Sequence, residues 1–198
     1  MAFQTKQREP IFDNHIKLII DKRSRELFGI FLIGFSILFF IILFSYNPED
    51  PSWLSSNGKA PTNYLGRFGA SISSVLFMII GSSAWVIPTI LLIWGLRFLF
   101  HNGWNKAFGR LIYSPIAVAI ICIFASSNPT PANWSNPFGF GGLFGEMVFG
   151  LIKNFLVIDQ LIEERALTLG LLIISVCIFL FVLGFNLFEL KKLTRGFL

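Results

Sequence analysis

The amino-acid sequence predicts an all-α integral membrane protein, a four-helix transmembrane bundle with both termini in the cytoplasm. Two observations lead to this prediction: four long stretches contain no charged side chain, and the basic residues between them favour alternate sides. The stretches hold 22, 29, 35 and 23 residues: Leu27–Pro48, Phe68–Leu96, Leu111–Gly145 and Ala166–Phe188. Because a helix rises about 1.5 Å per residue, roughly 20 apolar residues cross a hydrocarbon core about 30 Å thick.

The composition agrees with a membrane protein. Charged residues make up 14% of the chain and apolar residues 54%, whereas an ordinary soluble domain carries about 25% charged residues. A charged side chain at mid-bilayer costs about 2.5–3.5 kcal/mol on insertion scales, which explains why the charges lie between the stretches. Cys122 and Cys177 fall inside predicted spans, so we interpret them as small apolar residues rather than as a disulfide or metal site.

The distribution of basic residues predicts the orientation. Residues 1–26, 97–110 and 189–198 hold twelve of the sixteen Lys and Arg, whereas the loops 46–67 and 126–165 hold four. By the positive-inside rule, both termini and the loop 97–110 are cytoplasmic, and the other two loops lie outside. The basic excess flanks the spans, which favours anionic lipid headgroups over nucleic acid as its partner.

Residues 1–26 are interpreted as a cytoplasmic segment and 27–46 as the first span. The part 11–26 mixes apolar and basic residues, a pattern typical of an amphipathic helix on the inner leaflet but also of a helical extension of the span. We expect the span to end before Pro48 and Pro51, because proline lacks an N–H and disfavours helix in the residue before it.

The second span is expected over 70–98, which is longer than a bilayer needs, with a kink at Pro88. Trp94 and Trp104 are expected to lie at the inner interface. Small residues at spacings of three, four and seven let helices approach closely in lipid, so they are predicted to form a packing face. These residues are Ala70, Ser74, Gly81, Ala84 and Pro88.

The third span is expected over 109–127 and the fourth over 166–188, with a cytoplasmic linker beginning at 189–198. A segment rich in Pro, Asn and Gly follows the third span and cannot be helical. Residues 143–158 then show helical periodicity with charges in the middle. This helix is expected in the outer interface or as a re-entrant segment, because a fifth span would place the basic tail outside.

The sequence carries no motif of a known catalytic centre: no phosphate loop, no H-E-x-x-H, no C-x-x-C and no G-x-S-x-G. We therefore expect no catalytic residue, no cofactor and no metal. Glu146 and Lys153, seven residues apart in the amphipathic segment, are a possible polar membrane site. They fit an ion or proton relay, but a polar face wetted by the outer headgroups is the favoured interpretation. A small transporter or channel subunit is accordingly the alternative function.

The first outer loop carries a recognisable string of residues. Ser45-Tyr46-Asn47-Pro48-Glu49-Asp50-Pro51-Ser52-Trp53 resembles the S-Y-x-P-x-D-P-S-W signature of the N-terminal four-helix membrane domain of FtsK, the septal DNA translocase family of bacteria. Three further parts resemble the same domain in the same order. These are the N-x-x-G-x-x-G-A pattern at 63–70, the interior of helix two at 81–97, and the glycines Gly141, Gly142 and Gly145.

This resemblance implies a membrane anchor and scaffold for cell division and chromosome segregation, located in the bacterial inner membrane at the division septum. It also implies contacts with divisome membrane proteins and assembly of a homo-oligomer, a hexamer in that family. DNA and ATP are handled there by a motor that follows a linker. The sequence reaches Leu198 before any nucleotide-binding motif, so we expect this chain itself to be non-catalytic.

The residues Asp50, Pro51, Ser52 and Trp53 are the predicted partner-binding site. The prolines of the loop restrict its backbone conformation, and the side chain of Asp50 can accept hydrogen bonds from backbone N–H groups of the turn. Trp53 is expected at the membrane–water interface. The alternative is a structural turn that binds no partner.

Overall fold

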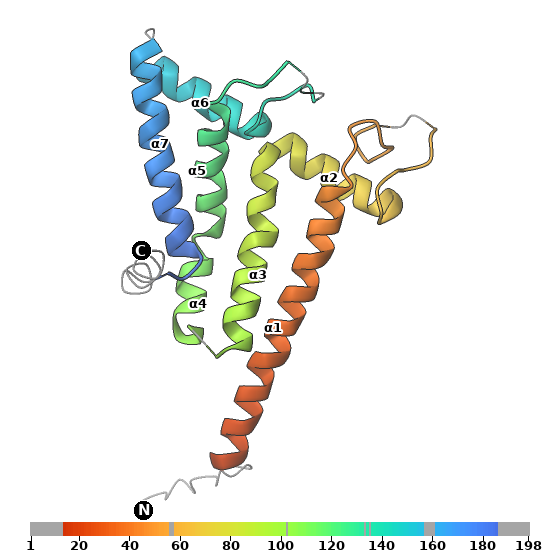
Figure 1. The fold of residues 1–198 in the computed structure, drawn as a ribbon, viewed down its shortest axis with the longest axis vertical. Coiled ribbons are helices and arrows are strands. Elements are labelled where there is room, and N and C mark those ends of the chain that lie inside the picture. Colours follow the sequence, from red (N-terminus) through yellow and green to blue (C-terminus); the bar gives the residue numbers. More distant parts are fainter. Residues whose placement is uncertain are drawn as a thin grey trace, which may run out of the picture.

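The computed structural model describes residues 14–55, 58–101, 103–132, 134, 136–156 and 161–185. Within these residues every regular element is a helix (Figure 1). In chain order they are α1 (Asn14–Phe44), α2 (Gly66–Ile80), the 3-10 helix η1 (Gly81–Trp85), α3 (Val86–Leu99), α4 (Trp104–Leu111), α5 (Ser114–Ser126), α6 (Gly142–Leu156) and α7 (Leu161–Val182).

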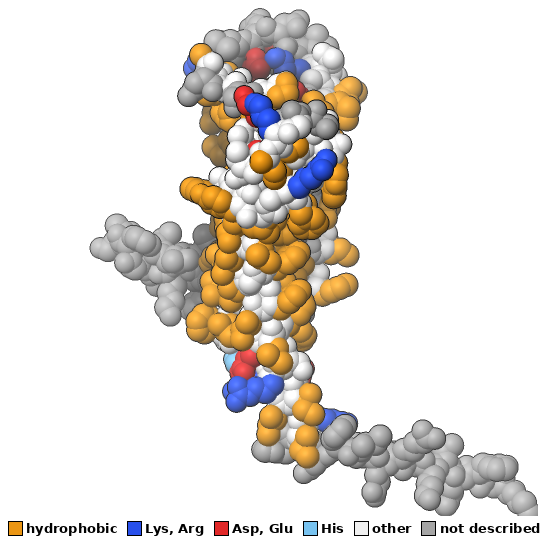
Figure 2. Space-filling model, turned by 90° about the vertical axis from the view of Figure 1, so that its right-hand side faces the viewer, with side chains coloured by type: hydrophobic (Ala, Val, Ile, Leu, Met, Phe, Trp, Pro, Cys, Tyr) orange, Lys and Arg blue, Asp and Glu red, His pale blue; other side chains and the backbone are white. Residues whose placement is uncertain are grey.

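Four helical segments of this described part are long and apolar enough to cross a membrane. They are Ile16–Phe44, Gly66–Leu99, Lys106–Ser126 and Glu163–Val182. Many of their outward side chains are large and apolar, as expected where the surrounding solvent is lipid. Figure 2 shows the resulting apolar band, with charged side chains above and below it. The prediction of an all-α membrane protein with four spans is confirmed.

The four spans are arranged as two antiparallel pairs, α1 with α3 and α5 with α7 (Figure 1). We call the end of the bundle where α1 begins and α4 lies the basic end, and the opposite end the loop end. The helices α2 and α6 lie obliquely at the loop end (Figure 1). Contacts between α3 and α5, which join the two pairs, are sparse.

Small residues bring α1 and α3 together. A Cβ atom on Gly29 would lie 2.7 Å from the carbonyl oxygen of Gly95, so the two backbones touch there. Further along, the Ser36 hydroxyl donates to the carbonyl oxygen of Pro88 at 2.7 Å. Such close backbone approach gives dispersion contacts and interhelical hydrogen bonds, the attractions that remain when lipid replaces water.

The second span breaks at a different residue from the one predicted. Pro88 lies in the first turn of α3, where a proline is tolerated because its missing N–H has no helical partner anyway. The break lies at η1, whose first residue Gly81 has φ 57°. The expectation of a kink at Pro88 was therefore wrong.

The other helix limits differ from the expected ones by a few residues. α6 (Gly142–Leu156) begins one residue before the segment 143–158 that was expected to be an interfacial helix, and it lies at the loop end. α7 begins five residues before 166, with Glu163 and Glu164 in its first turn, where acidic groups favour the helix dipole. It ends at Val182, because Gly184 adopts φ 88°. The predicted helix ends at 158 and 188, and the segments 1–13 and 189–198, lie outside the described residues.

Residues 14–26 continue the first span without interruption, so α1 is a single helix of 31 residues. This is the geometry of a helical extension, one of the two alternatives for that segment. In Figure 1 the first turns of α1 extend beyond the other helices at the basic end.

Each end of the bundle has its own small apolar core. At the basic end, Trp94 is 1% exposed, and its indole Nε1 donates to the carbonyl oxygen of Val182 at 2.8 Å. Trp94 was expected at the interface and is instead the centre of this core. At the loop end, the ring of Tyr46 stacks on Phe77 with centroids 4.2 Å apart.

Candidate interaction surface at the loop end

Asp50 is the buried anchor of the loop that follows α1. Its side chain is 3% exposed. Oδ1 accepts hydrogen bonds from the backbone N–H and the hydroxyl of Thr62, both at 2.8 Å, and Oδ2 accepts from the backbone N–H of Asn63 at 3.0 Å. A buried carboxylate is stable only when hydrogen bonds replace its hydration. Asp50 thus ties the two sides of the loop together.

Asn63 continues this connection to the end of α1. Its Nδ2 donates to the carbonyl oxygens of Ile42 and Ser45, at 2.9 and 3.1 Å, and its Oδ1 accepts from the backbone N–H of Leu65. The last four carbonyls of a helix have no partner within the helix. Asn63 therefore caps α1 and fixes the direction in which the chain leaves toward α2.

The turn itself is closed by short-range hydrogen bonds. Asn47 Oδ1 accepts from the backbone N–H of Glu49 at 3.0 Å, and the Ser55 hydroxyl donates to the carbonyl oxygen of Asp50 at 3.1 Å. Ser52 Oγ accepts from the backbone N–H of Leu54. Asn and Ser side chains stabilise turns in this way. The loop is consequently a folded unit.

This folded turn exposes an aromatic side chain at its tip. Trp53 is 72% exposed and its neighbour Leu54 is 50% exposed. Asp50, Pro51 and Ser52 are buried. The four residues predicted as one site therefore have two kinds of position: three lie inside the loop, and Trp53 points out of it.

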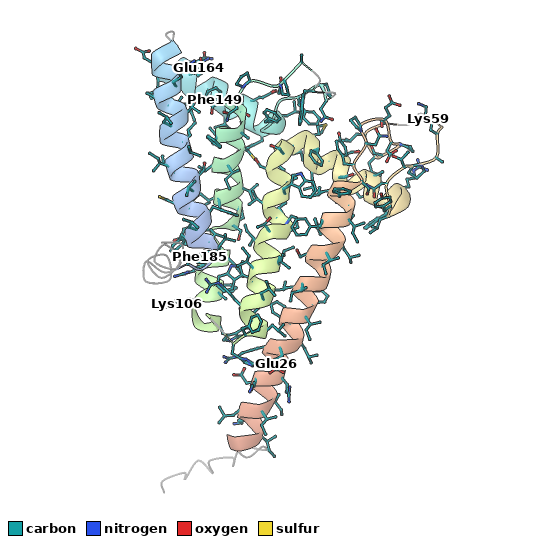
Figure 3. The ribbon with its side chains drawn as sticks, viewed as in Figure 1. Glu26, Lys59, Lys106, Phe149, Glu164 and Phe185 are labelled. Atoms are coloured by element: carbon teal, nitrogen blue, oxygen red, sulfur yellow. The ribbon has the colours of Figure 1, made fainter. Side chains whose placement is uncertain are left out.

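The first loop is also joined to the second loop of the same end. The Tyr46 hydroxyl donates to Oδ1 of Asn136 at 2.9 Å. Burial raises the pKa of Tyr46 above its ordinary value, so the neutral phenol that donates this bond persists into alkaline solution. Lys59 and Glu49 form an exposed ion pair at 3.2 Å on the outer edge of the first loop (Lys59 is labelled in Figure 3).

A backbone contact between Gly81 and Gly142 joins the two helix pairs. Both residues have positive φ, 57° and 65°. A Cβ on Gly142 would lie 2.5 Å from the backbone nitrogen of Gly81, and a Cβ on Gly81 would lie 2.1 Å from the carbonyl oxygen of Phe140. Ser82 donates to that same oxygen through its N–H and its hydroxyl, both at 2.8 Å. Only glycine can adopt the positive φ and also fit the space between the two backbones at these positions.

The structure places the predicted packing residues on three successive elements. Ala70 and Ser74 lie on α2, Gly81 and Ala84 on η1, and Pro88 on α3. All are buried except Ser74, which is half-buried. The role of these five residues as one packing face of the bundle stays a prediction.

Glu146 and Lys153 lie on α6 but have different partners. Glu146 accepts a hydrogen bond from the backbone N–H of Gly139, whereas Lys153 Nζ lies 3.0 Å from Oε1 of Glu164 on α7. Figure 3 shows Glu164 beside α6 at the loop end. Glu146 lines one cavity of about 340 Å³, and Glu164 lines another of about 630 Å³. The functional role of Glu146 and Lys153 stays a prediction.

Sequence reasoning assigned no role to Asn63, Gly29 or Gly95. The sequence signal for Asn63 was its place at the start of the N-x-x-G-x-x-G-A pattern at 63–70, in which Gly66 begins α2. For Gly29 and Gly95, the sequence offered only isolated glycines within apolar runs. Within the described residues, no group of three or more His, Cys, Asp and Glu side chains is placed to hold a metal.

Comparison with known proteins adds family information. Over residues 21–195 the chain matches the family described as the 4TM region of DNA translocase FtsK/SpoIIIE. Relatives named DNA translocase FtsK include those of Rickettsia typhi (26% identical, 84% of this chain, 23% of the relative) and Azospirillum brasilense (29%, 76% and 26%). The relative from Rickettsia bellii is 32% identical over 58% of this chain and 15% of its own length. The chain thus spans about a quarter or less of these relatives, and no solved structure matches it.

Proposed function

Because the chain belongs to the family of 4TM regions of the DNA translocases FtsK and SpoIIIE, we propose that it is the membrane anchor and scaffold of such a translocase. In this role it holds the protein at the division septum of the bacterial inner membrane and contacts membrane proteins of the division machinery. The family match over residues 21–195 is the observation that carries this proposal.

In this role, ATP hydrolysis and DNA movement are carried out by another part of a longer protein. An ATP-driven motor that moves DNA, and assembly of the subunits into a homo-oligomer, belong to this proposed whole. The 4TM region matched here is not the motor region of the relatives, which supports a non-catalytic role for these 198 residues. In this proposal both termini face the cytoplasm, and the loop end faces outward.

The exposed Trp53 supports a partner surface on the first loop. Aromatic side chains are enriched at the centres of protein interfaces, because one rigid ring buries a large area at a small entropic cost. Asp50 and Asn63 hold the turn in one conformation, so a partner would bind a preformed surface. We therefore assign partner contact to Trp53 and Leu54, and positioning of the turn to Asp50, Pro51 and Ser52.

The double variant Trp53→Ala/Leu54→Ala tests this surface. Carried on the full-length protein in dividing cells, it is expected to lose septal localisation and co-purification with division proteins, at unchanged membrane level. The matched control is Phe108→Ala at the basic end, where the side chain is 84% exposed, and it should localise normally. Normal septal localisation of the double variant would refute the partner surface.

The transporter alternative has a separate test. The predicted spans carry charged side chains only at Arg97 and Arg110, each one residue from the end of its span, whereas transporters commonly use ionisable groups deep in the membrane. Purified protein in liposomes should show no flux that Glu146→Gln abolishes. A substrate-specific flux that depends on Glu146 would favour the transporter over the scaffold.

A further inference from the structure

The cavity of about 630 Å³ that Glu164 lines lies between α5 and α7 at the loop end. Residues 126–129, which are the end of α5 and the segment after it, form one wall. The first turns of α7 form the other wall. Figure 1 shows α5 and α7 side by side up to this end of the bundle. The two membrane-crossing segments have their ends here, at Ser126 and Glu163, so the cavity lies where the spans leave the hydrocarbon of the membrane.

α7 contributes two rows of side chains to this cavity. Neighbouring residues of a helix point about 100° apart, because one turn takes 3.6 residues. Glu164 and Arg165 both line the cavity, so they border it on different sides and do not face one another. One turn further along, Thr168 follows Glu164 and Leu169 follows Arg165. The cavity therefore has a negative and a positive group at its outer rim and an apolar side chain toward the middle of the membrane.

The hydroxyl groups of the lining are occupied or turned away. Those of Ser127 and Thr168 donate to backbone carbonyl oxygens one turn earlier, at 2.7 and 2.9 Å. The Ser126 hydroxyl is buried, and it faces the glycines that pack α6 against α5. These three side chains form the wall. Recognition of a ligand is left to the amide and the charged groups of the lining.

These remaining groups offer acceptors on one side and donors on the other. Asn128 Nδ2 donates to the carbonyl oxygen of Phe124 at 2.9 Å, which leaves its Oδ1 as an acceptor. Oε1 of Glu164 lies 3.0 Å from Lys153 Nζ, which leaves its Oε2 as a second acceptor. Arg165 is exposed and forms no ion pair with another described residue. The cavity thus presents an anionic acceptor and an amide acceptor beside a cationic donor.

The ligand that matches this arrangement carries both signs of charge. A guanidinium binds the oxygens of a phosphate in its planar fork. A carboxylate beside an amide oxygen suits a primary ammonium, which has three N–H groups to donate. A headgroup with negative charge alone would lie against the Glu164 carboxylate, and a quaternary ammonium has no N–H to donate to it. The two charges therefore select a phosphoethanolamine group.

The surroundings of the cavity indicate that a lipid supplies this group. Residues 166–188 carry no charged side chain, so Arg165 lies at the boundary between the span and the headgroup layer, where long basic side chains reach the interface. Leu169 is 61% exposed one turn deeper, so this side of the cavity borders acyl chains. A soluble zwitterion would leave that apolar side uncovered.

We propose that the cavity binds the headgroup of a phosphatidylethanolamine molecule from the leaflet at the loop end. The phosphate lies beside Arg165, the ammonium lies beside Glu164 and Asn128, and one acyl chain runs along Leu169. The lipid thereby joins the end of α5 to the first turns of α7.

The test uses the whole chain in phosphatidylcholine nanodiscs that contain a trace of a lipid with a photoreactive diazirine on its acyl chain, close to the glycerol. One probe has an ethanolamine headgroup and the other a choline headgroup, and mass spectrometry locates the cross-linked residues. Labelling of Leu169 should be at least about fivefold stronger with the ethanolamine probe. Phe31, which is 63% exposed on α1, is the internal reference and should be labelled equally by both probes.

Four variants separate the two charges. Arg165→Gln should lower labelling of Leu169 by the ethanolamine probe at least about fivefold, whereas Arg67→Gln, exposed on α2 at the same end, should leave it unchanged. Glu164→Gln should remove the preference between the probes. Lys153→Gln breaks the same ion pair but keeps the carboxylate, so it should retain the preference. The thermal unfolding midpoints of all four should stay within a few degrees of that of the parent chain.

Three results would overturn the proposal. One is equal labelling of Leu169 by the two probes in the unchanged chain. Another is loss of the preference in Lys153→Gln as well as in Glu164→Gln, which would assign the effect to the ion pair between them. Soluble glycerophosphoethanolamine should not compete with the probe, and if it abolished labelling, the ligand would be a soluble zwitterion in place of a lipid.

Discussion

The loop end and the basic end of the bundle are held together by different chemistry. At the loop end, the contacts are backbone contacts and buried hydrogen bonds: Gly81 against Gly142, and Asp50 and Asn63 within the first loop. At the basic end, guanidinium groups lie over aromatic rings, as Arg25 does over Trp104 at 5.0 Å and Arg97 over Phe185 at 5.2 Å.

This difference follows from the backbone at each end. The loop end carries long non-helical segments beside the membrane, and their N–H and C=O groups need fixed partners. The described part of the basic end is mostly helical, so apart from the buried Trp94 its contacts beyond the helices are made by long side chains that adjust at little cost. The loop end should accordingly be intolerant of single substitutions and suited to present a fixed surface, whereas the basic end should tolerate them.

The largest effect is expected for Gly142→Ala. The substitution places a Cβ 2.5 Å from the backbone nitrogen of Gly81 at a residue with φ 65°. Strain and overpacking together should lower the free energy of unfolding by more than about 3 kcal/mol. Gly150→Ala on the same helix is the control, because its Cβ would meet no atom within 4 Å. Unfolding in mixed detergent measures the free energy of unfolding of both variants. Equal stability of the two would show that the close Gly81–Gly142 backbone contact does not stabilise the fold.

An intermediate effect is expected for Asp50→Ala. This variant leaves the N–H groups of Thr62 and Asn63 and the Thr62 hydroxyl without their acceptor. The free energy of unfolding is expected to fall by about 2–4 kcal/mol, and amide hydrogen exchange at residues 62–63 should become faster. Glu49→Ala, which removes an exposed ion pair to Lys59, should cost less than about 1 kcal/mol. Unchanged amide exchange in Asp50→Ala would show that the loop does not depend on this carboxylate.

The smallest effect is expected for Arg25→Gln at the basic end. It removes the guanidinium over Trp104 and the ion pair with Asp21. An exposed cation–π contact and an exposed ion pair contribute about 0.5–1 kcal/mol each at most. The midpoint of thermal unfolding should therefore shift by only a few degrees. If Arg25→Gln lowered the free energy of unfolding as much as Asp50→Ala, the two ends would not differ in their tolerance of substitutions.

The span count and the helical class could be predicted from the sequence, because the absence of charge over about 20 residues is a local property. The limits of α2 and η1 could not be predicted so well. Pro88 suggested a kink, but the helix breaks at Gly81, because a proline in a first turn costs nothing there while Gly81 meets Gly142 from a distant segment.

The candidate site was predicted in part. The sequence pointed to Asp50 through Trp53 as a turn, and the string of Pro, Ser and Asp carried the signal. It could not separate the inward Asp50 from the outward Trp53, because that separation depends on Thr62 and Asn63 approaching from the other side of the loop. The role of Asn63 as the cap of α1 depends on the same approach.

The sequence by itself determined the solvent of this protein and the number of its crossings, because the cost of burying charge in lipid is summed along each segment separately. The tertiary structure decided which segments pair, which glycines touch, and that α5 and α7 border a cavity at the loop end. Those outcomes depend on the fit between surfaces from distant segments, and such fit has no signature in any one segment.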